Sequence, residues 1–183
     1  FSDQKVTAGG ARNIGLANAE GEYILFADSD DYFEAGIFEC FDEECNSQLD
    51  MVQFCVTSFV EGEDRLGDRH LYLERAYEFD KGLTLYLSIE PPYAKLISRK
   101  FLEYHSIRFS EVAAGNDVYF SAQLAIFGKN KRFSRKVVYH VSQNTKSITA
   151  TQTDRKNCCR ISEQIKKVKL VKRETSMFYA SFY

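Results

Sequence analysis

The chain has 183 residues, of which 44% are hydrophobic and 27% are charged, as expected for one soluble globular domain. A net charge of −2 excludes the basic field of a nucleic-acid-binding protein, and no apolar run is long enough for a membrane span. Five cysteines without zinc-binding spacing favour reduced thiols in a cytosolic protein. No signal peptide is visible, and the chain begins at Phe1 without Met, so we expect an excised fragment, a processed chain or a chain missing its first residues.

The first third of the chain alternates helical and strand-like patterns. Residues 8–19 have helical spacing, and residues 24–26 resemble a short buried strand. Residues 34–46 form the next predicted helix, and residues 50–59 form the next predicted strand. This order indicates an α/β sheet built by crossover connections.

Patterns in the rest of the chain are less regular. Residues 61–68 are a predicted loop, and residues 69–79 predict one or two irregular strands. Residues 80–88 predict a short helix with Asp80 as its N-cap. The remaining predicted elements are an extended segment at 93–98, helices at 99–105 and 115–127, a strand at 132–141, and a long basic helix from Asp154 to about Met177.

Three carboxylates directly follow the predicted strand at 24–26. Asp28 and Asp30 are two residues apart, so on an extended backbone their side chains can point the same way. Carboxylate oxygens at the end of a strand suit hard cations such as Mg²⁺ and Mn²⁺. The alternative is a solvated acidic turn, which Asp and Ser also favour.

Two blocks of the sequence, with GARNIGL, GEYI and DSDD at residues 10–31 and with PYAKL and GNDVYF at residues 92–120, resemble family 2 glycosyltransferases of the GT-A fold. The first block matches the family pattern ARN.G...A.GEYI.FLDSDD at residues 10–16, 21–24 and 28–31. The second block, with the elements that follow it, comprises residues 92–96, 101–102, 107–109 and 115–120, then Tyr139 and residues 147–149. The resemblance implies an α/β, Rossmann-like mixed sheet with flanking helices, truncated at its N-terminal side, plus a C-terminal helix. We therefore expect a partial GT-A domain at residues 1–150 and a basic helical tail at residues 151–183.

The sequence departs from the family pattern in two places. The family's first nucleotide-binding strands have no counterpart here, so we expect this chain alone to transfer sugar poorly. The family's Glu-Asp pair appears as Asn116-Asp117, which keeps the aspartate and loses the charge of the glutamate.

The resemblance implies a role for each motif residue. Asp30 and Asp28 are implied to coordinate a divalent cation, Mn²⁺ or Mg²⁺, and Asp28 also to lie near the donor ribose. Asp117 is implied to be the base that deprotonates the acceptor hydroxyl, although an aspartate there also suits a helix N-cap. Arg12 is a candidate contact for the donor diphosphate, with an exposed helix salt bridge as the alternative.

Other side chains near these motifs leave alternatives open. Lys95 has the same two interpretations as Arg12. His140 is a candidate further metal ligand or a structural histidine. Asp31 either supports the metal ligands or caps the following helix.

The implied activity is metal-assisted, inverting transfer of a sugar from a nucleotide-sugar donor to a saccharide or lipid-linked acceptor. The expected setting is bacterial surface polysaccharide synthesis, in the cytoplasm or at the inner face of the membrane. The basic tail suits an anionic membrane surface. Its alternative is a solvated helix whose apolar stripe packs on the domain, namely Ile161, Ile165, Val168 and Val171. The competing functions are a non-catalytic sugar-binding or assembly module and, more remotely, a metal-dependent phosphohydrolase.

Overall fold

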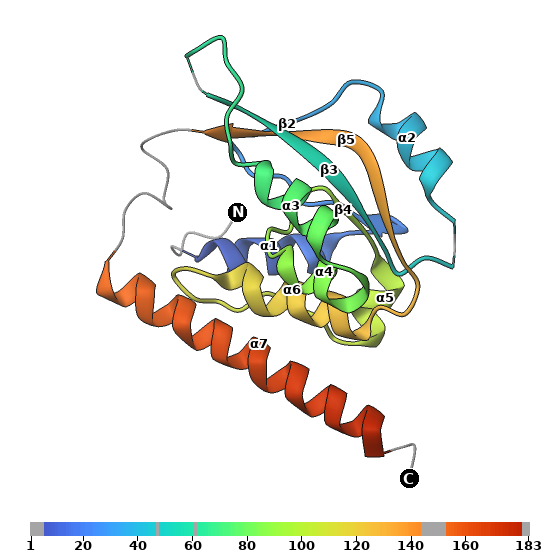
Figure 1. Ribbon diagram of the computed structural model, residues 1–183, viewed down its shortest axis with the longest axis vertical. Helices are drawn as coiled ribbons and strands as arrows, with labels where there is room; N and C mark the ends of the chain where they lie inside the picture. Colours follow the sequence, from blue (N-terminus) through green and yellow to red (C-terminus); the bar gives the residue numbers. More distant parts are fainter. Residues whose placement is uncertain (1–5, 47, 61, 144–152, 181–183) are drawn as a thin grey trace.

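The computed structural model describes residues 6–46, 48–60, 62–143 and 153–180. Within these residues, seven helices and five strands follow one another along the chain (Figure 1). The helices are α1 (Ala8–Asn18), α2 (Ile37–Glu44), α3 (Leu71–Phe79), α4 (Gly82–Ser88), α5 (Arg99–Tyr104), α6 (Asn116–Phe127) and α7 (Asp154–Ala180). The strands are β1 (Tyr23–Ile24), β2 (Tyr32–Phe33), β3 (Met51–Val60), β4 (Lys95–Ser98) and β5 (Lys131–Gln143).

The strands form one mixed sheet in the order β1-β4-β3-β5-β2. The long central strands β3 and β5 are parallel, from Met51 opposite Lys131 to Val60 opposite Gln143. The other three strand pairs are antiparallel. Both edge strands, β1 and β2, have two residues each, so little regular strand lies at either edge. This sheet with its flanking helices confirms the predicted α/β architecture.

Helices cover the sheet in layers. In Figure 1, α3 and α4 lie in front of the sheet, and α6 lies between the sheet and the long helix α7. α7 packs along α6, and α2 packs against β5. One apolar cluster between these layers includes Phe54, Leu73 and Tyr139, each at most 1% exposed. Their complete burial fixes β3, α3 and β5 against one another.

A second apolar cluster is mainly aromatic. The rings of Phe109 and Phe120 stack with their centroids 3.8 Å apart, and Phe26 meets them edge-on at 5.0 and 5.7 Å. Such ring pairs add to the free energy gained by burial alone. Phe26 lies two residues before Asp28, and Phe120 lies three residues after Asp117. The cluster therefore fixes the backbone next to both motif aspartates.

The predicted strands at residues 69–79 are wrong, because this segment forms helix α3. Its buried side chains, Leu73 and Ala76, are three residues apart, as a helix requires. Leu, Glu, Arg and Ala in this segment favour a helix more than its two tyrosines favour a strand. Asp80 was also expected to cap α4, but it ends α3 and accepts the Ser88 hydroxyl at 2.6 Å.

Candidate functional site

The Asp cluster forms a turn just beyond β1. Phe26 is bridged to Tyr93, and the chain then turns so that the Asp31 N–H donates to the Asp28 carbonyl at 3.2 Å. Asp28 and Asp31 are partly buried, whereas Asp30 is exposed. The segment thus has the local geometry of an acidic turn, and it presents the Asp30 carboxylate outward.

Asp31 connects this turn to strand β5. Its Oδ1 accepts the backbone N–H of Ser142 at 2.7 Å, and the Tyr139 hydroxyl also bonds its carboxylate. The same hydroxyl accepts the backbone N–H of Asp28 at 2.8 Å. Burial raises the pKa of Asp31, and these hydrogen bonds oppose the rise. The alternative in which Asp31 caps α2 is wrong, because Gly36 is the N-cap of that helix.

Arg12 connects the turn to helix α6. Its guanidinium donates to Asp28 Oδ1 at 2.5 Å and to Asn116 Oδ1 at 2.7 Å. The guanidinium also lies 5.4 Å from the centroid of the Phe109 ring. The Arg12 side chain is only 18% exposed and bonds two distant segments, so the salt bridge that was the alternative is present but partly buried. Asn116, which we expect to replace the family's glutamate, accepts this hydrogen bond.

Asp117 is the second residue of α6. The N-cap is Gly115, whose φ of 74° is a left-handed conformation that glycine adopts without strain. The alternative in which Asp117 caps the helix is therefore wrong. Burial raises the pKa of Asp117, and the Arg12 guanidinium opposes the rise. A raised carboxyl pKa increases proton affinity, which a general base needs.

Lys95 is buried rather than exposed. At 2% exposure, its side-chain nitrogen donates to the carbonyl of Ile89 at 3.1 Å and to that of Pro91. Burial lowers the pKa of Lys95 to about 7, against the opposing effect of the Asp117 and Glu90 carboxylates. The alternative of an exposed salt bridge is wrong, because the side chain holds the backbone at residues 89–91.

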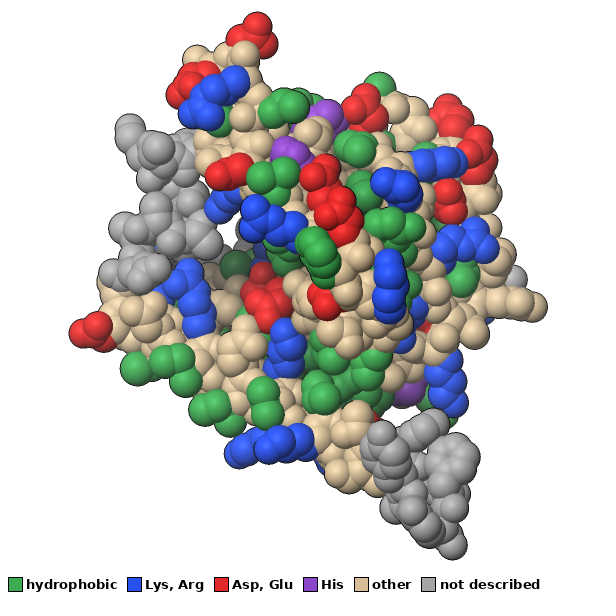
Figure 2. Space-filling model, viewed as in Figure 1, with side chains coloured by type: hydrophobic (Ala, Val, Ile, Leu, Met, Phe, Trp, Pro, Cys, Tyr) green, Lys and Arg blue, Asp and Glu red, His purple; other side chains and the backbone are tan. Residues whose placement is uncertain are grey.

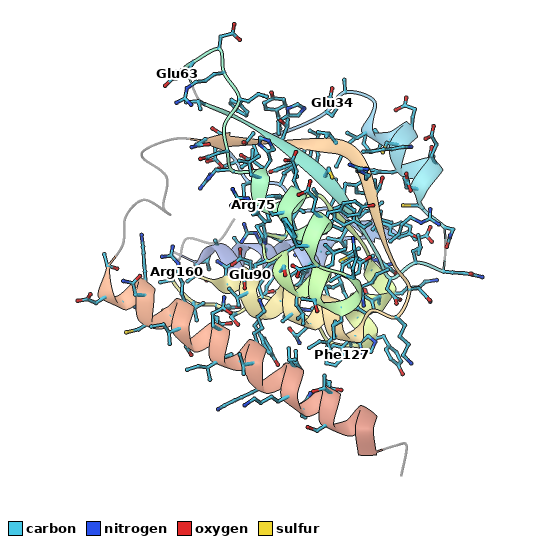
Figure 3. All side chains as sticks on the ribbon, in the orientation of Figure 1. Glu34, Glu63, Arg75, Glu90, Phe127 and Arg160 are labelled. Atoms are coloured by element: carbon cyan, nitrogen blue, oxygen red, sulfur yellow. The ribbon has the colours of Figure 1, made fainter. Side chains whose placement is uncertain are left out.

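Helix α7 reaches the same segment from the other side. The Glu90 carboxylate, labelled in Figure 3, accepts Lys167 Nζ at 2.6 Å and Gln164 Nε2 at 2.8 Å. The Glu90 carbonyl accepts the hydroxyl of Ser121, from α6, at 2.5 Å. β4, α6 and α7 therefore all hold the segment that precedes Lys95.

His140 interacts with β2 and the segment that follows it. Its Nε2 lies 2.6 Å from Glu34 Oε2, and its ring stacks on Tyr32 with centroids 4.5 Å apart. The hydrogen bond from His140 lowers the pKa of Glu34. These contacts favour a structural histidine. Among the residues that the structure describes, no group of three or more His, Cys, Asp or Glu side chains is placed to hold a metal ion.

Helix α7 turns its apolar stripe toward solvent. Ile161, Ile165 and Val168 are 60%, 49% and 51% exposed, whereas Leu170 is 4% exposed and Glu163 fully buried. The alternative in which the whole stripe packs on the domain is wrong, because only its fourth residue, Val171, is partly buried and the opposite face meets α6. In the described part of the chain, no helix combines the length and apolarity needed to cross a membrane.

Comparison with known families decides the identity of the chain. A family model described as glycosyl transferase family 2 matches residues 1–105. The chain belongs to glycosyl transferase family 2. This finding confirms the resemblance drawn from the motifs. The family elements at residues 147–149 lie outside the described residues.

Solved structures of S. aureus TarS share the GT-A fold of this family 2 chain. TarS 1–349 in complex with UDP-GlcNAc is 19% identical, with 83% of this chain and 44% of that chain covered and a TM-score of 0.64. TarS 1–349 in complex with UDP is 20% identical, with 76% and 41% covered and a TM-score of 0.56. The chain thus spans less than half the length of these structures. No curated protein sequence matches it.

Proposed function

We propose that this chain forms the metal-binding and acceptor side of a nucleotide-sugar-dependent glycosyltransferase. The observation that carries the proposal is the double hydrogen bond of Arg12 to Asp28 and Asn116. It connects helix α6, which carries Asp117, with the turn at Asp28, which is expected to face the donor. Family membership and the nucleotide complexes of the TarS structures support a nucleotide-sugar donor.

Asp117 is the proposed general base. The acceptor hydroxyl oxygen attacks the anomeric carbon, the bond from that carbon to the diphosphate oxygen breaks, and the hydroxyl proton passes to the Asp117 carboxylate. One displacement of this kind inverts the anomeric centre. The raised pKa of the Asp117 carboxyl supports this role, because it increases the driving force for proton transfer.

Arg12 is the proposed fixed cation for the donor diphosphate. A guanidinium has five N–H donors, and the hydrogen bonds to Asp28 and Asn116 use two of them. The remaining donors can bind phosphate oxygens while the side chain stays anchored. Arg12 and Asp28 are therefore the proposed donor-binding residues.

Asp30, with Asp28 beside it, is the proposed holder of Mn²⁺ or Mg²⁺. Mg²⁺ is usually bound through one or two carboxylates plus substrate phosphates, rather than in a complete protein cage. An exposed Asp30 next to a partly buried Asp28 fits such a shared site. The ion would neutralise charge on the departing diphosphate.

The proposed acceptor is a saccharide or a lipid-linked saccharide in bacterial surface polysaccharide synthesis. A lipid-linked acceptor would place the protein at the inner face of the membrane. The exposed apolar stripe of α7, flanked by lysines, supports peripheral contact of the tail with an anionic surface.

One observation favours a non-catalytic module as the second candidate. Arg12 already neutralises Asp28, and Asn116 lacks the charge of the family's glutamate. A site with its charges paired internally can bind sugars without turnover.

The test measures sugar transfer by the full-length protein that contains this chain, with a panel of UDP-sugars and simple saccharide acceptors. We expect transfer with Mn²⁺, none after chelation with EDTA, and a strong loss in Asp30→Asn. The exposed Asp42→Asn, on α2, is the matched control. Saccharide binding by calorimetry without turnover under any of these conditions would support the module instead.

A further inference from the structure

The segment at residues 89–91, just before β4, is held by two buried side chains. Lys95 is 2% exposed, and its side-chain nitrogen donates to the first and last carbonyls of the segment. Ser121 of α6 is 3% exposed, and its hydroxyl donates to the middle carbonyl, that of Glu90, at 2.5 Å. All three carbonyls therefore accept hydrogen bonds from the interior, which fixes the backbone of the segment against α6 and β4.

This segment lies against the face of α6 that carries Asp117. Asp117 and Ser121 are four residues apart, about one helical turn, so they share one face of the helix. This face is the inner side of α6. Glu90 and Lys95 both act on the Asp117 carboxyl from there. Burial raises the pKa of Asp117, the charges of Arg12 and Lys95 oppose the rise, and the charge of Glu90 adds to it.

Helix α7 holds the Glu90 carboxylate from the other side. Lys167 Nζ donates to that carboxylate at 2.6 Å and to the Leu87 carbonyl at 2.8 Å, and Gln164 Nε2 donates to the same carboxylate oxygen at 2.8 Å. The Lys167 and Glu90 side chains are only 17% and 31% exposed. In Figure 2, acidic and basic side chains lie next to one another above α7, where Figure 3 labels Glu90. These bonds keep the Glu90 charge in place.

The other groups that act with Asp117 come from α1 and α3. The Arg12 guanidinium, from α1, is bonded to Asp28 and Asn116. Tyr72, from α3, also interacts with Asp117, but burial raises the pKa of its hydroxyl, so it stays neutral in acid. Lys95 has a pKa of about 7 and therefore carries its charge in the acid range, where carboxyl groups titrate.

We propose that Lys95 and Glu90 are positioning residues for Asp117 and that their opposite charges set the pH below which Asp117 keeps its own proton. Lys95 holds the segment and stabilises the charged carboxylate, whereas Glu90 favours the protonated form. Both act through Asp117. The inference rests on the proposed role of Asp117 as the base that accepts the proton of the acceptor hydroxyl.

The pH dependence of sugar transfer by the full-length protein tests this proposal. Transfer should fall in acid as Asp117 becomes protonated. Lys95→Gln removes the positive charge, so this acid limb should move to higher pH by about half a pH unit or more. Glu90→Gln removes the negative charge, so the limb should move to lower pH. Loss of shape alone would lower the rate without moving the limb in opposite directions.

Controls and a folding check accompany these variants. Lys100→Gln on α5 and Glu39→Gln on α2 remove the same two charges at exposed positions, and both should keep the wild-type limb. Circular dichroism verifies folding. Glu90→Gln keeps the shape of a partly exposed side chain, so it provides the test even if Lys95→Gln does not fold.

A second readout separates this inference from the proposed function. The Asp117 carboxyl carbon is titrated by NMR in full-length protein labelled with ¹³C-aspartate, and Asp117→Asn assigns the signal. We expect the titration midpoint to rise in Lys95→Gln and to fall in Glu90→Gln. If the midpoint moves in this way but the acid limb does not follow it, the two charges act as inferred and Asp117 is not the base.

The inference itself is overturned if the folded variants leave both the midpoint and the limb at their wild-type positions. It is also overturned if both variants move them in the same direction. In either case, transfer that still depends on Asp117 would leave the proposed function intact.

Discussion

The two sides of helix α6 handle charge in opposite ways. On the inner side, Arg12 bonds both Asp28 and Asn116, so opposite charges are paired within the protein. On the outer side, Arg108 and Lys169 line a cavity with no carboxylate among its walls. Internal pairing holds the inner side in one geometry before any ligand arrives. The cations on the outer side are exposed to solvent instead.

The buried ionisable groups on the two sides differ in the opposite sense. Lys95, on the inner side, bonds only neutral carbonyls, and burial lowers its pKa to about 7. Glu163, on the outer side, bonds a cation and a hydroxyl. A buried charge keeps its ionised form only where a partner compensates the loss of water. The pH dependence of stability can therefore test Lys95, and substitution can test Glu163.

The largest expected effect is on activity. Asp117→Asn removes the proposed base, so the rate of sugar transfer by the full-length protein should fall on the order of 10²–10⁴-fold. The thermal unfolding temperature should change little, because the side chain keeps its shape. The matched control is Asp42→Asn on α2. Transfer at the wild-type rate in Asp117→Asn would remove this residue from the mechanism.

The next effect concerns the docking of α7 on the outer side. Glu163→Ala leaves the Ser110 hydroxyl without its acceptor and opens a void, so unfolding should require about 2–3 kcal/mol less free energy. Glu174→Ala, which removes a more exposed pair with Arg173, should cost less than about 0.5 kcal/mol. Urea denaturation of both variants measures the difference. Equal stabilities would contradict the anchoring role of Glu163.

The third effect is a pH dependence that belongs to the inner side. Lys95 has a folded pKa of about 7, below the unfolded value of about 10.4, so the unfolded chain binds more protons between these pH values. Stability should therefore rise with pH in this window, by up to about 1.4 kcal/mol per pH unit.

Lys95→Met should flatten this dependence relative to the wild type. Denaturation at pH 7.5 and pH 9.5 tests the comparison, with the exposed Lys169→Met as the control that keeps the wild-type slope. If the wild type and Lys95→Met have parallel pH profiles, Lys95 is not buried as a neutral amine.

The smallest effect compares two tyrosine hydroxyls. Tyr139→Phe removes the hydrogen bonds to the Asp28 N–H and the Asp31 carboxylate, which should cost about 1–2 kcal/mol of stability. It should also raise the pKa of Asp31 further, because the hydroxyl opposes the effect of burial. Tyr119→Phe, in the outer cavity, should change stability by less than about 0.5 kcal/mol. A larger loss of stability in Tyr119→Phe than in Tyr139→Phe would contradict the stabilising role of the Tyr139 hydroxyl.

Local sequence signals predicted much of the fold and the motif residues, but not their partners. The spacing from Arg12 through Asp28 to Asp117 indicated the family, and the family model confirms it. The bond from Arg12 to Asn116 spans 104 residues, and no periodic pattern encodes a contact of that range. The role of the Tyr139 hydroxyl was missed for the same reason.

Local sequence patterns also could not predict the burial of Lys95 or the face of α7 that packs on the domain. Lysine is rarely buried, so its burial here becomes evident only from the carbonyls at residues 89–91 that surround it. In α7, the stripe of Ile161, Ile165 and Val168 was the natural choice for the packed face. Partners on other segments favour the opposite face, where Glu163 meets Ser110 and Lys167 meets Glu90.

Ser110 joins the first and last helices that the structure describes. Its carbonyl lies so close to Gly9 of α1 that a side chain there has no room, and its hydroxyl donates to Glu163 of α7. The next residue, Glu111, accepts Asn13 Nδ2 at 3.3 Å. Helices far apart in the sequence often open independently of each other. Here a shared anchor couples them, so the amide hydrogens of α1 and of the docked part of α7 should exchange with solvent as one cooperative unit.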